Sequence, residues 1–318
     1  MHFENKISWG ACRQAERKFL TSTLKPDLDN ANVGNFLAEA FPYRRVSAFF
    51  IERLMNLKSI AEKNPLIHCI TNYVTVNDVA NCILAVGASP IMADEIDEMA
   101  EIISISDALV LNIGTANSRT AASMELAGRL ANQKNIPVIL DPVGAGISSF
   151  RSKITEKFLQ NIQFAAIRGN ISEISFCAGK NSSAHGVDSS VDDEKFSAKE
   201  ISKFVAEKFN CIAIVTGKTD FISDGKNFAQ IKNGVAEMKK ITGTGCMLSG
   251  ILAAHLSFSK NKFAAAVNAV ASMGIAGEIS FDKYKNFGTG SLRTGIIDAL
   301  GVIDEEIILQ KGKIFYES

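Results

Sequence analysis

Gly243 and Gly245 flank Thr244 and lead directly into Cys246 and a long apolar run with helical spacing. The first turn of a helix carries backbone N–H groups without partners in the helix, and the helix dipole favours negative charge there. Because glycine lets a ligand come close to the backbone, this glycine turn predicts a cradle for an anion, most simply a phosphate. A tight turn into a helix that binds no ligand is the alternative.

The residues on either side of the glycine turn extend this prediction. Residues 234–240, just before it, alternate like a strand, so we predict a strand, the glycine turn and a helix in that order. Cys246 then lies at the start of the helix, where the acidity of a thiol should be increased and where the thiol can face whatever the amides hold.

Further polar residues follow short apolar runs elsewhere in the chain. In an open α/β sheet the ligand binds beyond the C-terminal ends of the strands, so these residues are expected to meet at one rim. Each also has a simpler explanation: Asp141 can cap the helix after Pro142, Thr216 can belong to a plain turn, and Met92 can be core. The coincidence of all of them at strand ends favours a site. They are Thr71, Asn72, Asp94, Asn112, Gly114, Thr115, Asp141, Arg168, Gly169, Asn170, Thr216 and Gly217.

The elements that position these residues alternate between strand and helix. The predicted strands are continuous apolar runs, which are typical of parallel sheets covered by helices on both faces. Asp224-Gly225 is a hairpin signal, so antiparallel strands should join the sheet late, at one edge. We predict strands at 65–70, 88–93, 108–113, 137–141, 164–167 and 211–216, and helices at 48–63, 77–86, 97–104, 121–132, 154–161, 171–178, 198–209, 246–257 and 264–281.

Composition narrows the classes of partner. The chain has 318 residues, of which 47% are hydrophobic, and 34 basic residues balance 34 acidic ones. A net charge of zero gives no indication of a nucleic-acid partner. The six cysteines form no CxxC pair, so neither a disulfide framework nor a zinc site is indicated, and free thiols fit a reducing cytosol. We identify no apolar run of membrane-spanning length.

The chain divides at its start. Residues 1–46 lack sustained periodicity and mix acidic with basic residues around no signal-type apolar centre, which argues against a leader peptide. We predict that they form a poorly ordered extension and that residues 47–318 form a single α/β domain.

From about residue 64 to 300 the sequence resembles the hydroxyethylthiazole kinase family of the ribokinase-like superfamily. The order and spacing of the shared motifs are kept throughout. One departure is Gly288-Thr-Gly-Ser, where the family commonly has Gly-Pro-Gly-Ser. The motifs are Ile70-Thr-Asn, Leu84-Ala-Val-Gly-Ala-Ser-Pro-Ile-Met, Leu111-Asn-Ile-Gly-Thr, Leu140-Asp-Pro-Val-Gly-Ala-Gly, Ala166-Ile-Arg-Gly-Asn-Ile-Ser-Glu-Ile, Val215-Thr-Gly and Thr242-Gly-Thr-Gly-Cys.

The resemblance implies a three-layer ribokinase-like fold and ATP-dependent phosphorylation of 4-methyl-5-(2-hydroxyethyl)thiazole in thiamine salvage. It also implies Mg²⁺, a cytoplasmic location and a homotrimer with sites between subunits. The apolar helix face around Val79, Ile83 and Val86 is one candidate subunit surface, and the core of the monomer is the alternative place for it.

The same resemblance assigns roles to residues. It implies that Asn72 and Met92 line the thiazole pocket and that Gly243 contacts the substrate. Arg168 and Thr216 hold the ATP phosphates. Asp141 and Glu173 hold Mg²⁺, directly or through water. The anion hole around the γ-phosphoryl group is formed by Gly243, Thr244, Gly245 and the N–H of Cys246.

These roles suit phosphoryl transfer, which needs alignment and charge neutralisation more than covalent help. An apolar pocket suits a neutral thiazole, with Ile70, Val74, Met92 and Cys246 as candidate lining. Relatives in the wider superfamily carry Asp at the Cys246 position as a base. Because a thiol is a poorer proton acceptor, our hypothesis is that Cys246 orients the alcohol and is at most a weak base.

Two other functions remain open from the sequence. One is a ribokinase-like kinase for another small alcohol, such as hydroxymethylpyrimidine or pyridoxal, although Cys246 in place of Asp argues against it. The other is a non-catalytic sensor of a thiamine precursor, against which the retained acids Asp141 and Glu173 argue.

Overall fold

Nine strands form one sheet in the computed structural model, which describes residues 57–179 and 197–317. Their order across the sheet is β2-β1-β3-β4-β5-β6-β7-β8-β9. The strands are β1 (Leu66–Ile70), β2 (Ser89–Ile91), β3 (Ala108–Asn112), β4 (Val138–Asp141), β5 (Ala166–Asn170), β6 (Ile212–Thr216), β7 (Asp220–Ser223), β8 (Phe228–Ile231) and β9 (Ile314–Glu317).

The pairing changes direction once along the sheet. Strands β2 to β6 pair in parallel, whereas β6–β7, β7–β8 and β8–β9 pair antiparallel. The turn at Asp224-Gly225 joins β7 to β8, with Gly225 at φ +89°. This confirms the prediction of a mostly parallel sheet with late antiparallel strands at one edge.

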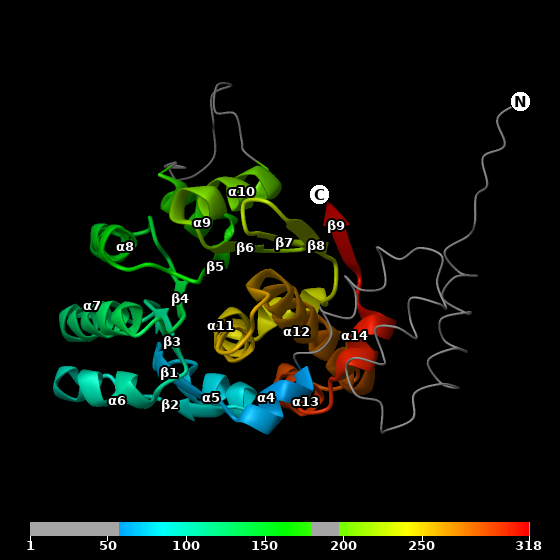
Figure 1. Cartoon of the computed structure of the whole chain (residues 1–318). Coiled ribbons are helices and arrows are strands. Elements are labelled where there is room, and N and C mark those ends of the chain that lie inside the picture. The colour runs from blue at the N-terminus through cyan, green and yellow to red at the C-terminus, as the bar shows by residue number, and fades with distance from the viewer. Residues whose placement is uncertain (1–56, 180–196, 318) are drawn as a thin grey trace, which may run out of the picture. The chain divides into compact units, whose positions relative to one another are not determined.

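Helices cover both faces of the sheet (Figure 1). On one face lie α4 (Leu57–Lys63), α5 (Val76–Ala85), α11 (Thr244–Leu256), α12 (Lys262–Tyr284), α13 (Thr289–Leu300) and α14 (Glu305–Lys311). On the other lie α6 (Met99–Ile105), α7 (Ser118–Gln133), α8 (Ser149–Asn161), α9 (Ile171–Ala178) and α10 (Ala198–Phe209). Two short 3₁₀ helices, η1 (Ile96–Glu98) and η2 (Ala236–Lys240), complete the elements.

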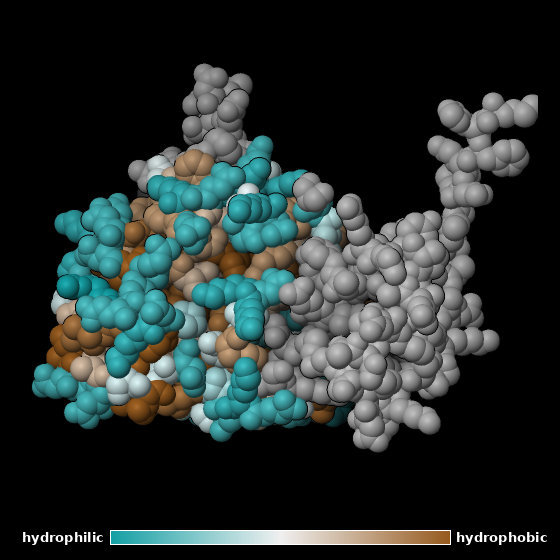
Figure 2. All heavy atoms as spheres, viewed as in Figure 1, coloured by the Kyte–Doolittle hydropathy of each residue, from teal (hydrophilic) through white to brown (hydrophobic). Residues whose placement is uncertain are grey.

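The continuous apolar strands supply both cores because successive side chains point to opposite faces. Val110 in β3 packs into the core with α11, whereas its neighbours Leu109 and Leu111 pack into the core with α7, and all three are buried. The molecular surface mixes polar and apolar side chains, with brown patches over α6 and α7 in Figure 2. Exposed apolar side chains on these two helices include Ile105 and Leu126.

One predicted strand is wrong. Residues 234–240 do not join the sheet; the first two are irregular and the rest form η2. Met238 packs on α12 at Gly277, where an added Cβ would lie 2.3 Å from its Sδ. The Gly234 N–H is bonded to Glu278 of α12 at 2.9 Å. Contacts with α12 therefore decide the conformation of this segment, and its alternating pattern does not.

Helix α12 is longer and more apolar than we expected from the sequence. Its 23 residues are sufficient in length and composition to cross a membrane, which corrects the expectation that no run reaches that length. However, 89% of its most apolar window is buried inside the protein, which is typical of a core helix. Most of its buried residues are small, so neighbouring elements approach it closely.

Val79 and Ile83 also belong to the core. Both are buried in the cluster that includes α11, and they pack around Gly250. The expectation that this helix face forms a subunit surface is therefore wrong for these two side chains. Two other predictions, the extension at residues 1–46 and the first part of the helix at 48–63, lie outside the described residues.

Candidate active site

A charged pair, Asp141 and Arg168, lies at the C-terminal ends of the parallel strands. Asp141 ends β4, Arg168 lies in β5, and Thr216 ends β6. Arg168 Nη1 donates to Asp141 Oδ2 at 3.0 Å, and Nη2 donates to Thr216 Oγ1 at 3.1 Å. Arg168 and Asp141 are both buried. The register of the parallel strands therefore brings three of the predicted residues into contact.

The start of α11 lies against this pair. A Cβ on Gly245 would lie 2.3 Å from Arg168 Nη2, so the guanidinium packs on the backbone of the first turn. Gly243, the residue before the helix, has φ +85° and no side chain that caps it. Asp141 already balances the charge of the guanidinium. The uncapped N–H groups at the start of α11 lie beside this cation, so the helix end suits an anionic ligand.

Two buried polar atoms of the pair have no hydrogen-bond partner in the structure: Arg168 Nε and Asp141 Oδ1. The first is a donor and suits an anion. The second is a carboxylate acceptor and suits a cation, because burying it unpaired costs free energy. An unpaired cationic donor and an unpaired carboxylate oxygen on the same ion pair suit a phosphate group together with its metal ion.

Asp141 fits Mg²⁺, because its carboxylate is held by one oxygen and leaves the other free. Oδ2 accepts from Asn112 Nδ2 at 2.8 Å and Ser249 Oγ at 2.8 Å as well as from Arg168. Among the described residues no group of three or more His, Cys, Asp or Glu could form a complete metal cage. Mg²⁺ uses one or two carboxylates together with substrate phosphates, and Asp141 with one free oxygen can supply one of them.

Glu173 lies in the first turn of α9, on the other side of the loop that follows β4. Its Oε1 accepts from the Gly144 N–H at 2.9 Å, and its Oε2 accepts from the Asn170 N–H at 2.8 Å. Burial and the nearby Asp141 raise the pKa of Glu173, while these backbone bonds oppose the rise. Each oxygen keeps a lone pair for a metal ion or its water.

Cys246 contacts the predicted substrate residue Asn72. Its Sγ accepts from Asn72 Nδ2 at 3.2 Å and from Asn112 Nδ2 at 3.2 Å. Burial, followed by the charge of Asp141, raises the pKa of the thiol. This is the opposite of the increased acidity expected at the helix start, because burial and a nearby carboxylate both disfavour the thiolate. Both effects favour the neutral thiol over the thiolate.

The pocket lining is only partly as expected. Met92 is half-buried and packs against the same core as Cys246. Ile70 is buried in the core on the opposite face of the sheet and cannot line a pocket beside Cys246. Val74 is 58% exposed. The structure therefore places Met92 and Cys246 against the same core, on one face of the sheet.

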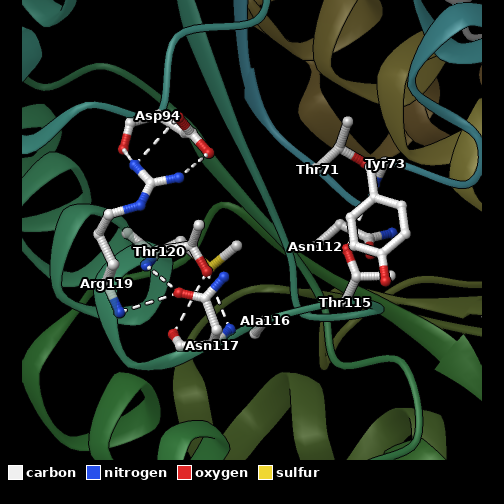
Figure 3. Close-up of a pocket in the computed structure, with 10 residues that line it drawn as sticks. Thr71, Tyr73, Asp94, Asn112, Thr115, Ala116, Asn117, Arg119 and Thr120 are labelled. Carbon is white, nitrogen blue, oxygen red and sulfur yellow. Dashed lines mark hydrogen bonds and ion pairs between the residues drawn. The ribbon is translucent and has the colours of Figure 1, made fainter.

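A pocket adjoins the site at the ends of β1, β2 and β3 (Figure 3). On one wall Arg119 faces Asp94 and donates to both carboxylate oxygens, at 3.2 and 2.9 Å. On the other the Tyr73 N–H donates to Thr115 Oγ1. Asn112 lines this pocket and also contacts Cys246, so the pocket borders the residues around Asp141 and Cys246. Asp94, predicted at the same rim, lines the pocket and is not in contact with Asp141 or Cys246 through any of these hydrogen bonds.

Sequence reasoning missed four residues that hold the site together. Ser249 is one turn after Gly245 and therefore on the same helix face, which is a signal that spacing alone provides. Asp220 Oδ1 accepts from the Gly217 N–H at 2.9 Å and fixes the turn after Thr216; burial raises the pKa of Asp220 to about 6. Nothing in the pattern indicated Thr75 or Arg151 as supporting residues.

Arg151 in α8 joins the loops that follow β3 and β4. Its Nη1 donates to the carbonyl oxygens of Ile113 at 2.7 Å and Val143 at 2.6 Å, and its Nη2 donates to Gly114 O at 2.6 Å. Thr75 in turn packs on Gly243, where an added Cβ would lie 2.2 Å from Thr75 Cγ2. Both residues fix backbone that borders the site.

Comparison with known proteins gives one consistent family. The family model described as "Hydroxyethylthiazole kinase family" matches residues 57–306. The chain is 50% identical over 259 residues to hydroxyethylthiazole kinase of Ruminiclostridium cellulolyticum, covering 81% of this chain and 95% of that protein. It is 46% identical over 263 residues to the enzyme of that name from Clostridium tetani, covering 82% and 96%.

Solved structures agree. The hydroxyethylthiazole kinase protein from Pyrococcus horikoshii has a TM-score of 0.75 at 35% identity, covering 85% of this chain and 100% of that one. A ribokinase-like superfamily protein from Enterococcus faecalis has a TM-score of 0.57 at 14% identity, covering 79% and 94%. The second likeness concerns the fold alone. The ribokinase-like fold and the family resemblance expected from the sequence are thus confirmed.

Proposed function

Because this chain belongs to the hydroxyethylthiazole kinase family, we propose that it transfers the γ-phosphoryl group of ATP to the hydroxyl of 4-methyl-5-(2-hydroxyethyl)thiazole. The product is the thiazole phosphate used in thiamine salvage. The observation that carries this proposal is the pair of unpartnered atoms, Arg168 Nε and Asp141 Oδ1, beside the uncapped start of α11. Such a pair suits a nucleotide phosphate and its metal ion.

The nucleotide phosphates bind Arg168 and Thr216. Arg168 Nε has no partner, and its Nη groups are already oriented by Asp141 and Thr216, so the side chain can bind phosphate oxygens without reorganising. The backbone N–H groups of Thr244, Gly245 and Cys246, following Gly243, form the anion hole for the migrating group. Gly245 is required because any side chain there would occupy the place of the guanidinium.

Asp141 and Glu173 hold Mg²⁺, Asp141 through Oδ1 and Glu173 directly or through water. Bound there, the ion neutralises charge on the phosphate oxygens. The three donors on Asp141 Oδ2 fix the direction of the carboxylate before the ion binds. Such outer partners usually determine how well a metal ligand is aimed.

The thiazole alcohol binds between Asn72, Met92 and the glycine turn, with Gly243 as a backbone contact. Cys246 faces its hydroxyl. Because burial raises the pKa of the thiol and favours its neutral form, Cys246 orients the alcohol and is at most a weak base. The alcohol oxygen attacks the γ-phosphorus in line, the bond to ADP breaks with its electron pair staying on ADP, and the alcohol proton passes late to an oxygen of the transferred phosphoryl group or to water, as the loose transition state allows.

The kinase domain spans residues 47–318, preceded by an extension at residues 1–46. It acts in the cytoplasm as a homotrimer with sites between subunits and needs no nucleic-acid or membrane partner. Exposed apolar side chains near the site, Tyr73 at 78% and Val74 at 58%, are available for subunit contact. Light scattering of the purified protein tests the assembly.

The activity is tested with a coupled assay of ADP release. The thiazole alcohol is compared with pyridoxal and hydroxymethylpyrimidine at saturating MgATP, with Asp141→Asn as the inactive control. Turnover of the thiazole with the highest kcat/KM supports the proposal. Preference for another alcohol would make the protein a different kinase, and binding without turnover would make it a sensor. A nucleotide complex with its triphosphate far from α11 would refute the anion hole.

A further inference from the structure

The amide groups of Asn72 and Asn112 have orientations that their neighbours dictate. Asn112 Oδ1 accepts from the Gly114 N–H at 2.9 Å, and Asn72 Oδ1 accepts from the Thr75 N–H at 3.1 Å and from Thr75 Oγ1 at 3.0 Å. Rotating either amide by half a turn would bring an NH₂ group against a backbone N–H. The oxygens are therefore anchored outwards, and both NH₂ groups point into the site.

The NH₂ group of Asn112 spans the two halves of the site. It lies 2.8 Å from Asp141 Oδ2 and 3.2 Å from Cys246 Sγ, so its two hydrogens go one to each. Asn72 uses its two hydrogens on Asn112 Oδ1 and on the same sulfur. All four amide hydrogens are thus accounted for, and Asn112 is buried with 1% of its surface exposed.

This placement joins groups on opposite sides of the reacting bond. Asp141 serves the metal and phosphate side, whereas Cys246 faces the acceptor alcohol. With Asn112, Arg168 and Ser249 all on Oδ2, the carboxylate keeps Oδ1 for the ion. With two N–H donors on Sγ, the S–H of Cys246 points away from both amides, and the side chain of Thr75 is a further hydrogen-bond partner of the thiol.

We propose that Asn112 is a positioning residue that holds the Asp141 carboxylate and the Cys246 thiol at one fixed separation. The inference rests on the proposed function, because it takes Asp141 as a magnesium ligand and Cys246 as a contact of the alcohol. Rates of phosphoryl transfer depend on the alignment of donor and acceptor, and a displacement of about 1 Å can cost on the order of 100-fold. The amide of Asn112 therefore sets the alignment of the phosphate side with the alcohol side, which neither Asp141 nor Cys246 sets alone.

The test measures both halves of the site in Asn112→Ala. Mn²⁺ binding, followed by electron paramagnetic resonance with a non-hydrolysable ATP analogue, should weaken about 10–100-fold, as for other outer partners of metal ligands. The KM for the thiazole alcohol should rise roughly fivefold for the lost donor to sulfur, and kcat should fall with it. Ser249→Ala is the matched control: it removes a donor from the same Asp141 oxygen and should weaken Mn²⁺ binding without changing the thiazole KM.

Several results would overturn the inference. Asn112→Ala that changes only one of the two constants, or neither, contradicts a bridging role. So does an equal rise of the thiazole KM in Ser249→Ala, because that variant leaves both donors on sulfur. If thermal melting shows that Asn112→Ala is unfolded, Asn112→Leu keeps the volume without the donors and must show both effects. A wild-type protein that fails to phosphorylate the alcohol refutes the proposed function itself, whereas wild-type turnover with an unaffected Asn112 variant refutes this inference alone.

Discussion

The guanidinium of Arg168 lies on the backbone of Gly245, at a distance that leaves no room for a side chain. An added Cβ would be 2.3 Å from Nη2 and 2.7 Å from Nη1. Gly245 lies inside α11, where alanine would be the better helix former. The glycine is therefore explained by the approach of the arginine and not by the conformation of the helix.

We expect Gly245→Ala to lower kcat/KM for ATP by about 100-fold or more, because the methyl group displaces the guanidinium from Asp141 and Thr216. Steady-state kinetics with varied MgATP measure the effect, with thermal melting to show that the fold persists. Gly290→Ala is the control, since nothing lies within 4 Å of a Cβ at that position. An alanine at 245 with wild-type ATP kinetics would contradict the role given to Arg168.

The thiol of Cys246 should matter modestly. Since it orients the alcohol and is at most a weak base, we expect Cys246→Ala to reduce kcat by roughly 10-fold, about the effect of losing one hydrogen bond. The slope of log kcat against pH between pH 6 and 8 should be the same in both proteins. A folded Cys246→Ala protein without any turnover would instead make the thiol essential to the chemistry.

The sequence predicted the parts of the site that depend on strand ends. Asp141, Arg168 and Thr216 meet because parallel neighbouring strands end at one rim, which apolar runs followed by polar residues already indicated. Ser249 was within reach of the same reasoning, since it is one turn along the helix from Gly245. Cys246 was predicted in place, but its raised pKa depends on burial that no local pattern reveals.

Long-range packing explains what the sequence did not predict. The segment at residues 234–240 alternates like a strand. However, Met238 packs on Gly277 of α12, and the segment pairs with no strand of the sheet. Strand β9 pairs with β8, with Phe228 opposite Glu317. Because the two strands are far apart in the sequence, no short-range signal could predict this pairing. Arg151 was missed because its three acceptors are backbone carbonyls of two different loops.

His255 in α11 should make stability depend on pH. The ring is buried, neither nitrogen has a hydrogen-bond partner in the structure, and burial lowers its pKa from 6.5 to about 4. The folded state therefore favours the neutral ring. Its contribution is fully present above pH 6.5 and is lost as the pH falls towards 4, by about 2 kcal/mol between pH 7.5 and pH 5.

Urea unfolding at pH 7.5, 6 and 5 measures this contribution in the wild type and in His255→Leu. The variant should lose less stability over that range by about 2 kcal/mol. It should also be at least as stable as the wild type at pH 7.5, because it removes an unpaired buried donor. Parallel pH profiles in the two proteins would show that His255 does not titrate as expected.

Thr289 is the first residue of α13, in the place where the family commonly has proline, and we expect Thr289→Pro to stabilise the protein. The N–H at this helix position has no partner within a helix, so proline loses nothing there. Gly288 before it is extended, with φ −84° and ψ 177°, which is the conformation that a following proline requires. The free energy of unfolding should rise by roughly 0.4–1 kcal/mol, because proline lowers the conformational entropy of the unfolded chain. Urea unfolding should show a higher midpoint, and the enzyme kinetics should be unchanged.

Thr294→Pro, in the interior of the same helix, is the control and should lower the free energy of unfolding by about 3 kcal/mol. If both substitutions destabilise the protein alike, the helix does not begin where the structure places it.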